Sequence, residues 1–155
     1  KTASEQQRVA AVVTPVTQRR YWQREFMLPS GNAITSDFGT RRSYNGGPYN
    51  SYHGGVDFSS LGDSSILAPS RGRVALVDLL EVRGNTIIID HGWGVYSALL
   101  HQSQILVKVG DVVDRGQLIG YIGATGLVTG PHLHWEMYVG SVQVDPMQWV
   151  VSAFP

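Results

Sequence analysis

The chain has 155 residues, of which 43% are hydrophobic, and it carries 12 basic and 12 acidic side chains and no cysteine. This length predicts one domain, and the apolar content is enough for a sizeable core. The zero net charge and the absence of a basic stripe argue against a nucleic-acid-binding protein. No apolar stretch is long enough to span a membrane, and no signal peptide is visible. Because Lys1 is not preceded by methionine, we interpret the chain as processed or excised, with any signal or anchor lost upstream.

The residue pattern of the first 20 residues differs from that of the rest of the chain. Ser4 to Val13 favours one or two helical turns, which Pro15 would end. We interpret residues 1–20 as a linker or the end of a preceding segment, and residues 21–155 as the domain.

From Tyr21 onward, short β-prone runs alternate with Gly, Pro, Asn and Asp. The clearest predicted strands are residues 72–80, 85–90, 95–100, 117–122 and 132–139. No later segment sustains helical periodicity. The sequence therefore predicts a mostly β fold, a single-domain antiparallel sandwich or barrel-like arrangement.

Two short segments hold three of the five histidines: His53-Gly-Gly-Val-Asp57 and His132-Leu-His134. On a strand, residues two or four apart share a face, so each pair of side chains would project together. Two imidazoles and a carboxylate suit Zn²⁺ and leave a fourth position open, as in catalytic sites. Either pattern alone is weak, since histidines also occupy half-buried strand edges.

The motifs His53-x-Gly-x-Asp57 and Gly130-Pro-His132-Leu-His134 resemble the two signature motifs of the LytM/lysostaphin-like zinc endopeptidases. Further segments follow in that family's order: residues 34–41, 68–74, 90–92, 109–113, 116–120 and 144–146. The resemblance extends from about residue 34 to about residue 149, and it implies a LytM-type peptidase fold.

The resemblance places the family's zinc ligands at His53, Asp57 and His134, and its two other active-site histidines at His101 and His132. Leu99 stands where the family more usually has an aromatic residue, which affects the wall behind His101 more than its chemistry.

The chain has no His-Glu-x-x-His helix to supply a glutamate base, so histidine is the natural substitute. Our hypothesis is that His132 takes a proton from the attacking water while His101 stabilises the oxyanion or protonates the leaving amine, or that these roles are reversed.

Two further features, Glu136 and the segment from Arg42 to Tyr52, each have a functional and a structural interpretation. Glu136 would share the face of His134 and orient it, or it is a surface glutamate. His91 is interpreted as structural. The segment from Arg42 to Tyr52 is a long irregular loop that would form one groove wall through Tyr44, Tyr49 and Tyr52, or a surface loop with incidental aromatics.

Residues 123–130 would form the opposite wall of the groove, where glycines allow a substrate backbone to approach. The sequence leaves open whether residues 1–20 cover this groove.

Enzymes of the resembled family cleave stem or cross-bridge peptides of bacterial peptidoglycan outside the cytoplasm. The resemblance thus implies an extracytoplasmic zinc endopeptidase with peptidoglycan peptides as partners. The alternative is a non-catalytic or latent regulator or wall-binding module, although degenerate relatives typically lack a metal ligand. A biotinyl or lipoyl carrier is disfavoured, because Lys108 lies in the wrong segment for a displayed lysine.

Overall fold

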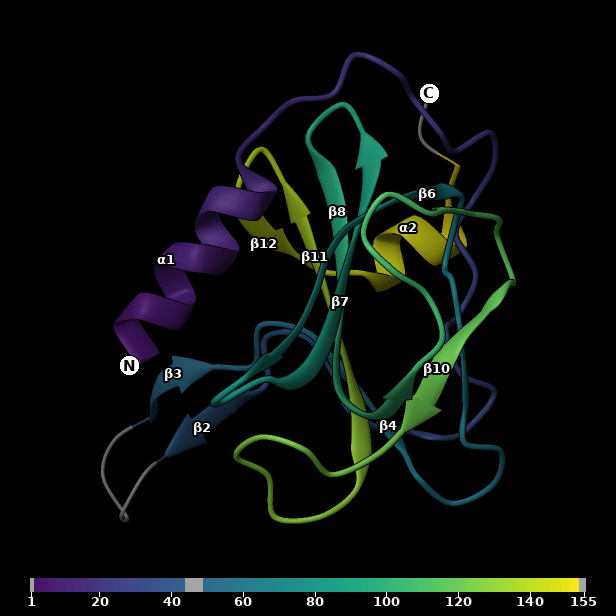
Figure 1. The fold of residues 1–155 in the computed structure, drawn as a ribbon. Helices are drawn as coiled ribbons and strands as arrows, with labels where there is room; N and C mark the ends of the chain where they lie inside the picture. Colours follow the sequence, from purple (N-terminus) through teal and green to yellow (C-terminus); the bar gives the residue numbers. More distant parts are fainter. Residues whose placement is uncertain (1, 44–48, 154–155) are drawn as a thin grey trace.

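Antiparallel strands dominate the structure, a computed structural model that describes residues 2–43 and 49–153 (Figure 1). The helices are α1 (Thr2–Val13) and α2 (Met147–Val151). The strands are β1 (Ile34–Ser36), β2 (Arg41–Ser43), β3 (Tyr49–Tyr52), β4 (Val56–Ser59), β5 (Ser65–Leu67), β6 (Gly72–Leu80), β7 (Gly84–Gly92), β8 (Val95–Ile105), β9 (Val112–Val113), β10 (Leu118–Ile122), β11 (His132–Val139) and β12 (Val142–Val144). The predicted mostly β, antiparallel fold is confirmed.

One large sheet organises the described residues, with strands in the order β1-β4-β11-β8-β7-β6-β9. β10 pairs with β5 and β8, and β12 pairs with β11. All of these pairings are antiparallel. Since β4, β11 and β8 are neighbours in this order, residues far apart in sequence meet at the centre of the sheet.

The five predicted strands all exist, with bounds that shift by at most a few residues except at the end of β8. The expectation that no helix follows residue 20 is wrong for α2, which has five residues. Such a helix is too short to show helical periodicity. Its sequence signal is local: Asp145 accepts a hydrogen bond from the Met147 N–H at 3.0 Å, and Pro146 fits a helix start.

The predicted irregular loop between Arg42 and Tyr52 is also partly wrong, because β2 and β3 pair there as an antiparallel hairpin. Tyr44 lies outside the described residues. The expected substrate contacts of Tyr49 and Tyr52 stay a prediction.

The large sheet is buried on both faces, and its strands alternate between two cores. In β7, Ile87 and Ile89 belong to one core, and Ile88 between them belongs to the other. In β11, Leu133 and Trp135 pack in the first core, which places His134 on the opposite face. The first core holds the aromatic cluster of Trp22, Phe26 and Trp149.

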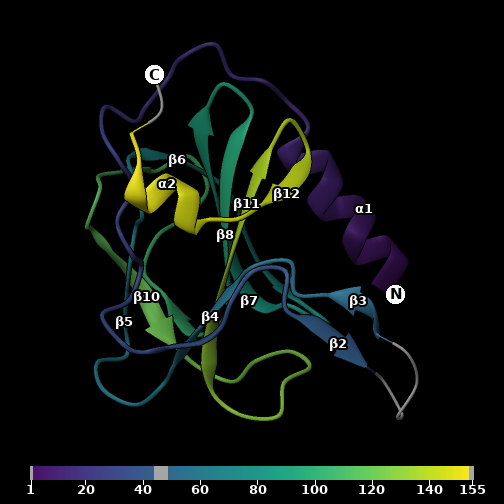
Figure 2. The same ribbon diagram turned by 180° about the vertical axis from the view of Figure 1, so that it is seen from behind.

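Helix α1 covers the second face beside β12 (Figures 1 and 2). Its Val9 and Val13 are buried in the second core, and the Tyr96 hydroxyl donates a hydrogen bond to the Pro15 carbonyl at 2.6 Å. The predicted helix exists and ends before Pro15, and it is longer than two turns. The domain boundary at residue 20 stays a prediction.

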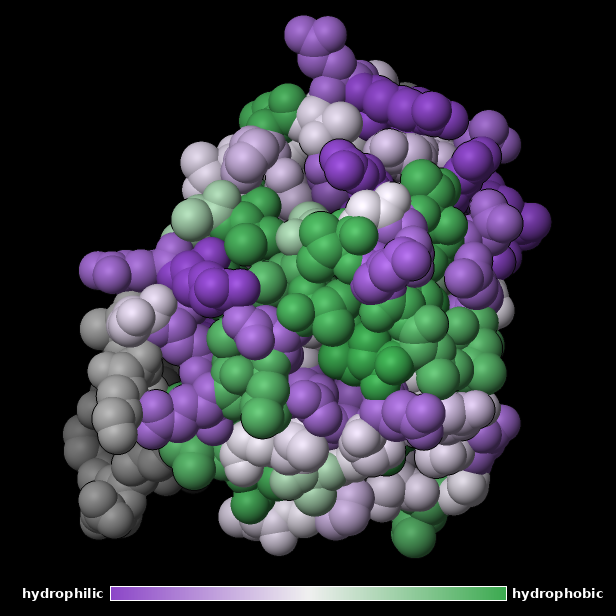
Figure 3. All heavy atoms as spheres, in the orientation of Figure 1, coloured by the Kyte–Doolittle hydropathy of each residue, from purple (hydrophilic) through white to green (hydrophobic). Residues whose placement is uncertain are grey.

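The surface mixes polar and apolar areas. Figure 3 shows hydrophobic side chains gathered in the middle of one face, with hydrophilic side chains above and beside them. Scattered apolar exposure is normal for folded proteins. Of the helices in the described ranges, none is long and apolar enough to cross a membrane.

Candidate metal centre and its cavity

Three adjacent strands bring the candidate residues together. His134 of β11 lies directly opposite Asp57 of β4, and on its other side it lies opposite Leu100 of β8. His132 is two residues before His134 and therefore shares its face. The register of the sheet thus fixes the site, and a slip of one residue would move these side chains to the other face.

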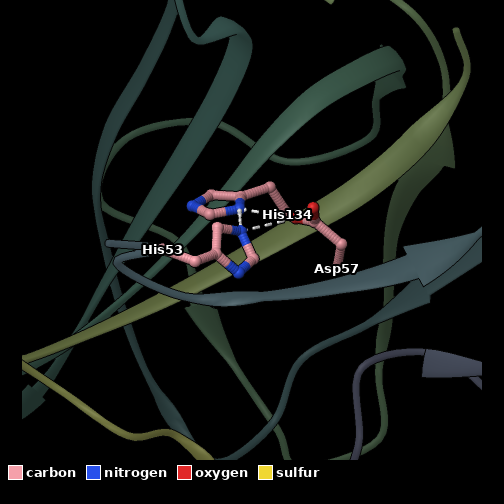
Figure 4. Close-up of side chains that lie close together, drawn as sticks. All are labelled: His53, Asp57 and His134. Carbon is pink, nitrogen blue, oxygen red and sulfur yellow. Dashed lines mark hydrogen bonds and ion pairs between the residues drawn. The ribbon is translucent and has the colours of Figure 1, made fainter. Parts of the chain in front are cut away.

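The side chains of His53, Asp57 and His134 point toward one another (Figure 4). Asp57 Oδ1 lies 2.7 Å from His134 Nδ1 and 3.2 Å from His53 Nε2, and the two histidine nitrogens are 3.1 Å apart. Both imidazoles are buried, at 6% and 9% exposure. One donor atom from each residue therefore faces a common point.

His53 reaches this point by a route that differs from strand periodicity. It precedes β4, and its backbone is held by two hydrogen bonds, from its own N–H to the Thr40 carbonyl and from the Gly39 N–H to its carbonyl, both at 2.8 Å. The expectation that His53 and Asp57 share one strand is therefore wrong, although their side chains do meet.

Gly55 lies between the two motif residues and has no room for a side chain. A Cβ there would lie 2.4 Å from the Trp135 carbonyl oxygen and 2.9 Å from Cε1 of His134. The glycine of the His-x-Gly-x-Asp motif is thus required by the close approach of its backbone to β11.

Hydrogen bonds on the far side of each imidazole fix which nitrogen carries a lone pair. His53 Nδ1 donates to the Asp37 carbonyl at 3.0 Å, which leaves Nε2 as an acceptor. His134 Nε2 lies 2.9 Å from Glu136 Oε2, and donation to this carboxylate leaves Nδ1 as the nitrogen that presents a lone pair once its own proton is lost. Two lone pairs and a carboxylate oxygen then converge, an arrangement that a cation satisfies.

Glu136 is anchored in turn. The Tyr138 hydroxyl donates to Glu136 Oε1 at 2.7 Å, and Gln143 Nε2 donates to that hydroxyl at 3.2 Å. Glu136 is buried rather than at the surface, so the structure supports its interpretation as the residue that orients His134. The sequence signal for Glu136 was its position two residues after His134 on the same strand, which places both side chains on one face.

The pKa values of His134 and Asp57 also indicate that these converging groups favour a positive charge among them. Burial lowers the pKa of His134, but the hydrogen bonds of Asp57 and Glu136 outweigh burial and raise the pKa to about 9. Burial would raise the pKa of Asp57, yet its hydrogen bonds to His134 and His53 hold that pKa well below its usual range. Asp57 is therefore a carboxylate at neutral pH.

His101 reaches the site through an irregularity in β8. Its φ is +63°, and the register against β7 shifts between Asn85 and Ile87. In a regular strand Leu100 and His101 would point to opposite faces, but both line the same cavity. The bulge therefore redirects His101 toward the metal centre, as bulges near active sites commonly do.

His101 and His132 lie side by side, with ring centroids 4.8 Å apart. His101 Nδ1 donates to the Thr125 carbonyl at 2.9 Å, and His132 Nδ1 donates to the Gly130 carbonyl at 3.1 Å. In both rings Nε2 is left for proton transfer. Burial lowers the pKa of His101 to about 4, so this imidazole is neutral at pH 7.

A cavity of about 1060 Å³ opens over these side chains. Residues 126–131 line it, so residues 126–130 of the segment 123–130 lie at the cavity, and their role as a wall of the substrate groove stays a prediction. Thr35 and Ser36 of β1 also line the cavity, as does Gln6 of α1. Within the described ranges, helix α1 thus contributes to the border of the groove.

A comparison with protein families matches residues 51–146 to peptidase family M23. The chain belongs to this family. The matched segment contains all five candidate site residues, and the resemblance to lysostaphin-like peptidases is confirmed.

Similar M23 proteins include hydrolases of the cell wall. The chain is 37% identical to the peptidoglycan DD-endopeptidase ShyA of Vibrio cholerae over 130 residues, which are 84% of this chain and 30% of ShyA. It also resembles the solved catalytic domain of the antimicrobial peptidase lysostaphin from Staphylococcus simulans, with 32% identity and a TM-score of 0.67, covering 78% of this chain and 93% of that domain.

A crystal structure described as a zinc-containing peptidase from Vibrio cholerae has 35% identity and a TM-score of 0.72, and covers 83% of this chain and 40% of that one. The M23 membership, this neighbour and the three converging donor atoms confirm the predicted zinc cofactor. The chain spans less than a third of the length of ShyA, so the activity of a whole relative is not carried over.

His91, predicted to be structural, is fully buried away from the cavity-lining residues. Its Nδ1 bonds the Arg71 carbonyl at 2.9 Å, and its Nε2 lies 2.8 Å from the Ser97 hydroxyl.

Sequence reasoning missed the contributions of Asp37, whose backbone carbonyl orients His53, and of Arg83, which lines the cavity. No sequence pattern pointed to either, because one acts through its backbone and the other comes from a turn.

Proposed function

We propose that this M23 protein is a zinc-dependent endopeptidase that hydrolyses peptide bonds in the stem or cross-bridge peptides of bacterial peptidoglycan. The observation that carries the proposal is the convergence of His53, Asp57 and His134 beneath an open cavity that also exposes His101 and His132. The similarity to the peptidoglycan DD-endopeptidase ShyA supports the substrate class.

The zinc ligands in this proposal are His53 through Nε2, Asp57 through Oδ1 and His134 through Nδ1. When bound, Zn²⁺ supplies Lewis acidity that activates water and polarises the scissile carbonyl. Glu136 holds His134 in the required tautomer. Asp57, kept ionised by its imidazole partners, supplies the negative charge that favours a dication.

Of the two orders of proton transfer that the sequence left open, we favour the one in which His101 is the base. Its Nδ1 already donates to the Thr125 carbonyl, and a neutral ring can only accept at Nε2. His132 then stabilises the oxyanion or protonates the leaving amine through its own Nε2. Nε2 of His132 lies 3.9 Å from Asp57 Oδ1, so this ring faces the proposed metal ligands.

The cavity lined by residues 126–131 and by Thr35 and Ser36 of β1 would receive the substrate peptide. Peptidoglycan lies outside the cytoplasm, so we place this activity in the periplasm, in the cell envelope or among secreted proteins.

The test is mass spectrometry of purified peptidoglycans of several cross-link chemistries after incubation with the protein. Zinc-loaded wild type should release fragments with new amino termini, and the mass of each fragment names the cleaved bond. A chelator and the Asp57→Ala variant should abolish release, whereas Asp63→Ala, an exposed aspartate outside the cavity, should not.

Variants His101→Ala and His132→Ala should bind zinc and lose most of their turnover, keeping a small but measurable residual rate. Full turnover in both with zinc bound would refute the assigned roles. Absence of any fragment despite bound zinc would refute the endopeptidase and favour the non-catalytic regulator.

A further inference from the structure

Glu5 belongs to helix α1, yet its carboxylate is buried and fully engaged with a turn next to the cavity. Its side chain is 4% exposed. Oε1 accepts a hydrogen bond from the Val82 N–H at 2.9 Å, and Oε2 accepts from the Arg83 N–H at 3.0 Å and from Arg83 Nη1 at 2.9 Å. One carboxylate thus binds the β6–β7 turn through two backbone N–H groups and a guanidinium.

The backbone carbonyls of Val82 and Arg83 accept hydrogen bonds from two residues that line the cavity. The Arg83 carbonyl accepts the His101 N–H at 2.9 Å, and the Val82 carbonyl accepts the Leu127 N–H at 3.0 Å. Each residue therefore connects α1 on its N–H side to a groove element on its carbonyl side. Leu127 belongs to the loop that lines the cavity.

The turn and this loop pack closely, backbone against backbone. A Cβ on Gly84 would lie 2.4 Å from the Thr125 backbone, and a Cβ on Gly126 would lie 2.4 Å from the Val82 carbonyl oxygen. Since neither glycine leaves room for a side chain, the two segments are packed directly together, and we expect a displacement of the turn to be passed on to the loop.

His101 is the element that depends most on this assembly. Its φ of +63° lies in the left-handed region, which a non-glycine residue keeps only when its surroundings impose it. The two hydrogen bonds that impose it go to the Arg83 carbonyl and to the Thr125 carbonyl. Both acceptors belong to the assembly that Glu5 holds.

We propose that Glu5 is a positioning residue for His101, and that α1 is part of the catalytic apparatus through the β6–β7 turn. This inference rests on the proposed function, because it takes His101 to act in peptide hydrolysis. Helix α1 also borders the cavity through Gln6, the neighbour of Glu5.

The chain offers a matched control on the same helix. Arg8 Nη2 forms an ion pair with Asp78 Oδ2 of β6 at 2.9 Å, with side chains 53% and 37% exposed. This pair also joins α1 to the sheet, but neither of its residues lines the cavity. Arg8→Ala therefore reports what loosening the helix does without releasing the turn.

The experiment compares Glu5→Ala, Glu5→Gln and Arg8→Ala, each in the wild-type and His101→Ala backgrounds. Glu5→Gln keeps the side-chain volume, so the test can still be read if Glu5→Ala does not fold. The measurements are hydrogen exchange of the His101 and Leu127 amides, zinc affinity, and kcat and KM on a soluble peptidoglycan fragment.

In the Glu5 variants we expect exchange at His101 and Leu127 to accelerate by about tenfold or more while zinc affinity stays unchanged. The kcat should fall by about tenfold to a hundredfold with little change in KM, the loss expected when a catalytic group is misplaced by about 1 Å. In the His101→Ala background, the Glu5 substitutions should cause no further loss, because the two residues act as one unit. Arg8→Ala should leave these quantities near wild type.

Equal exchange at His101 in the Glu5 and Arg8 variants would overturn the proposal. So would independent, multiplying losses of kcat in the double variants. If wild type cleaves no peptidoglycan but the exchange pattern changes as expected, the proposed function fails while the positioning of His101 by Glu5 stands.

Discussion

Replacing Gly55 by alanine is the sharpest test of how the fold builds the metal centre. The added Cβ would lie 2.4 Å from the Trp135 carbonyl oxygen, whereas real contacts of this kind essentially never fall below 3.0 Å. Strand β11 and the segment before β4 must therefore separate by about 0.6 Å, the difference between these distances. The same Cβ meets His134 Cε1 at 2.9 Å, so the imidazole must move as well.

This displacement exceeds what a zinc site tolerates, since ligand distances hold within about 0.2 Å. We expect zinc affinity to fall by about tenfold to a hundredfold, the loss typical when a ligand's supporting contacts are disturbed. The free energy of unfolding of the metal-free protein should fall by about 1–3 kcal/mol, as overpacking of a core usually costs.

The assay is competition for zinc with a chromophoric chelator, paired with denaturant unfolding. Gly31→Ala is the control, because a Cβ at Gly31 meets nothing within 4 Å. If Gly55→Ala binds zinc as tightly as Gly31→Ala and unfolds at the same denaturant concentration, the steric reasoning is refuted.

Three further outcomes follow from the structure. Asp57→Asn removes the charge between His53 and His134, so calorimetry should show zinc affinity reduced by about a hundredfold, and unchanged affinity would contradict the ligand assignment. Burial lowers the pKa of His91 to about 4, so between pH 6.5 and 4 the unfolded chain binds the extra proton and the folded protein loses up to about 3 kcal/mol of stability as the pH falls. In denaturant unfolding at several pH values, His91→Gln should lack this loss of stability between pH 6.5 and 4. Parallel curves of unfolding free energy against pH for the variant and wild type would disprove this reasoning. Phe26→Ala, at 1% exposure, should cost about 3–5 kcal/mol of unfolding free energy, and a loss below 1 kcal/mol would contradict its place in the core.

The sequence was sufficient wherever a local pattern determines structure. Alternation of polar and apolar residues in β11 placed His132, His134 and Glu136 on one face, because side chains on a strand repeat every two residues. The order of motifs identified the family, and Pro15 marked where α1 must end.

Local patterns failed where the backbone leaves its regular path. His53 lies before β4 and is directed by bonds to Thr40 and Asp37, so strand periodicity gave the right partner for the wrong reason. His101 was placed by resemblance only, since nothing in residues 95–105 shows a positive φ in the middle of a strand.

By itself, the sequence determined the chemistry of this protein: the donor types, their pairwise spacing and the mostly β framework are written in short contiguous segments. The tertiary structure decided how those segments meet. The register of β4, β11 and β8 sets the distances among the donors. Glu5 meets the turn at Val82 across 77 residues of chain. Such contacts depend on packing between distant elements, which no local pattern encodes.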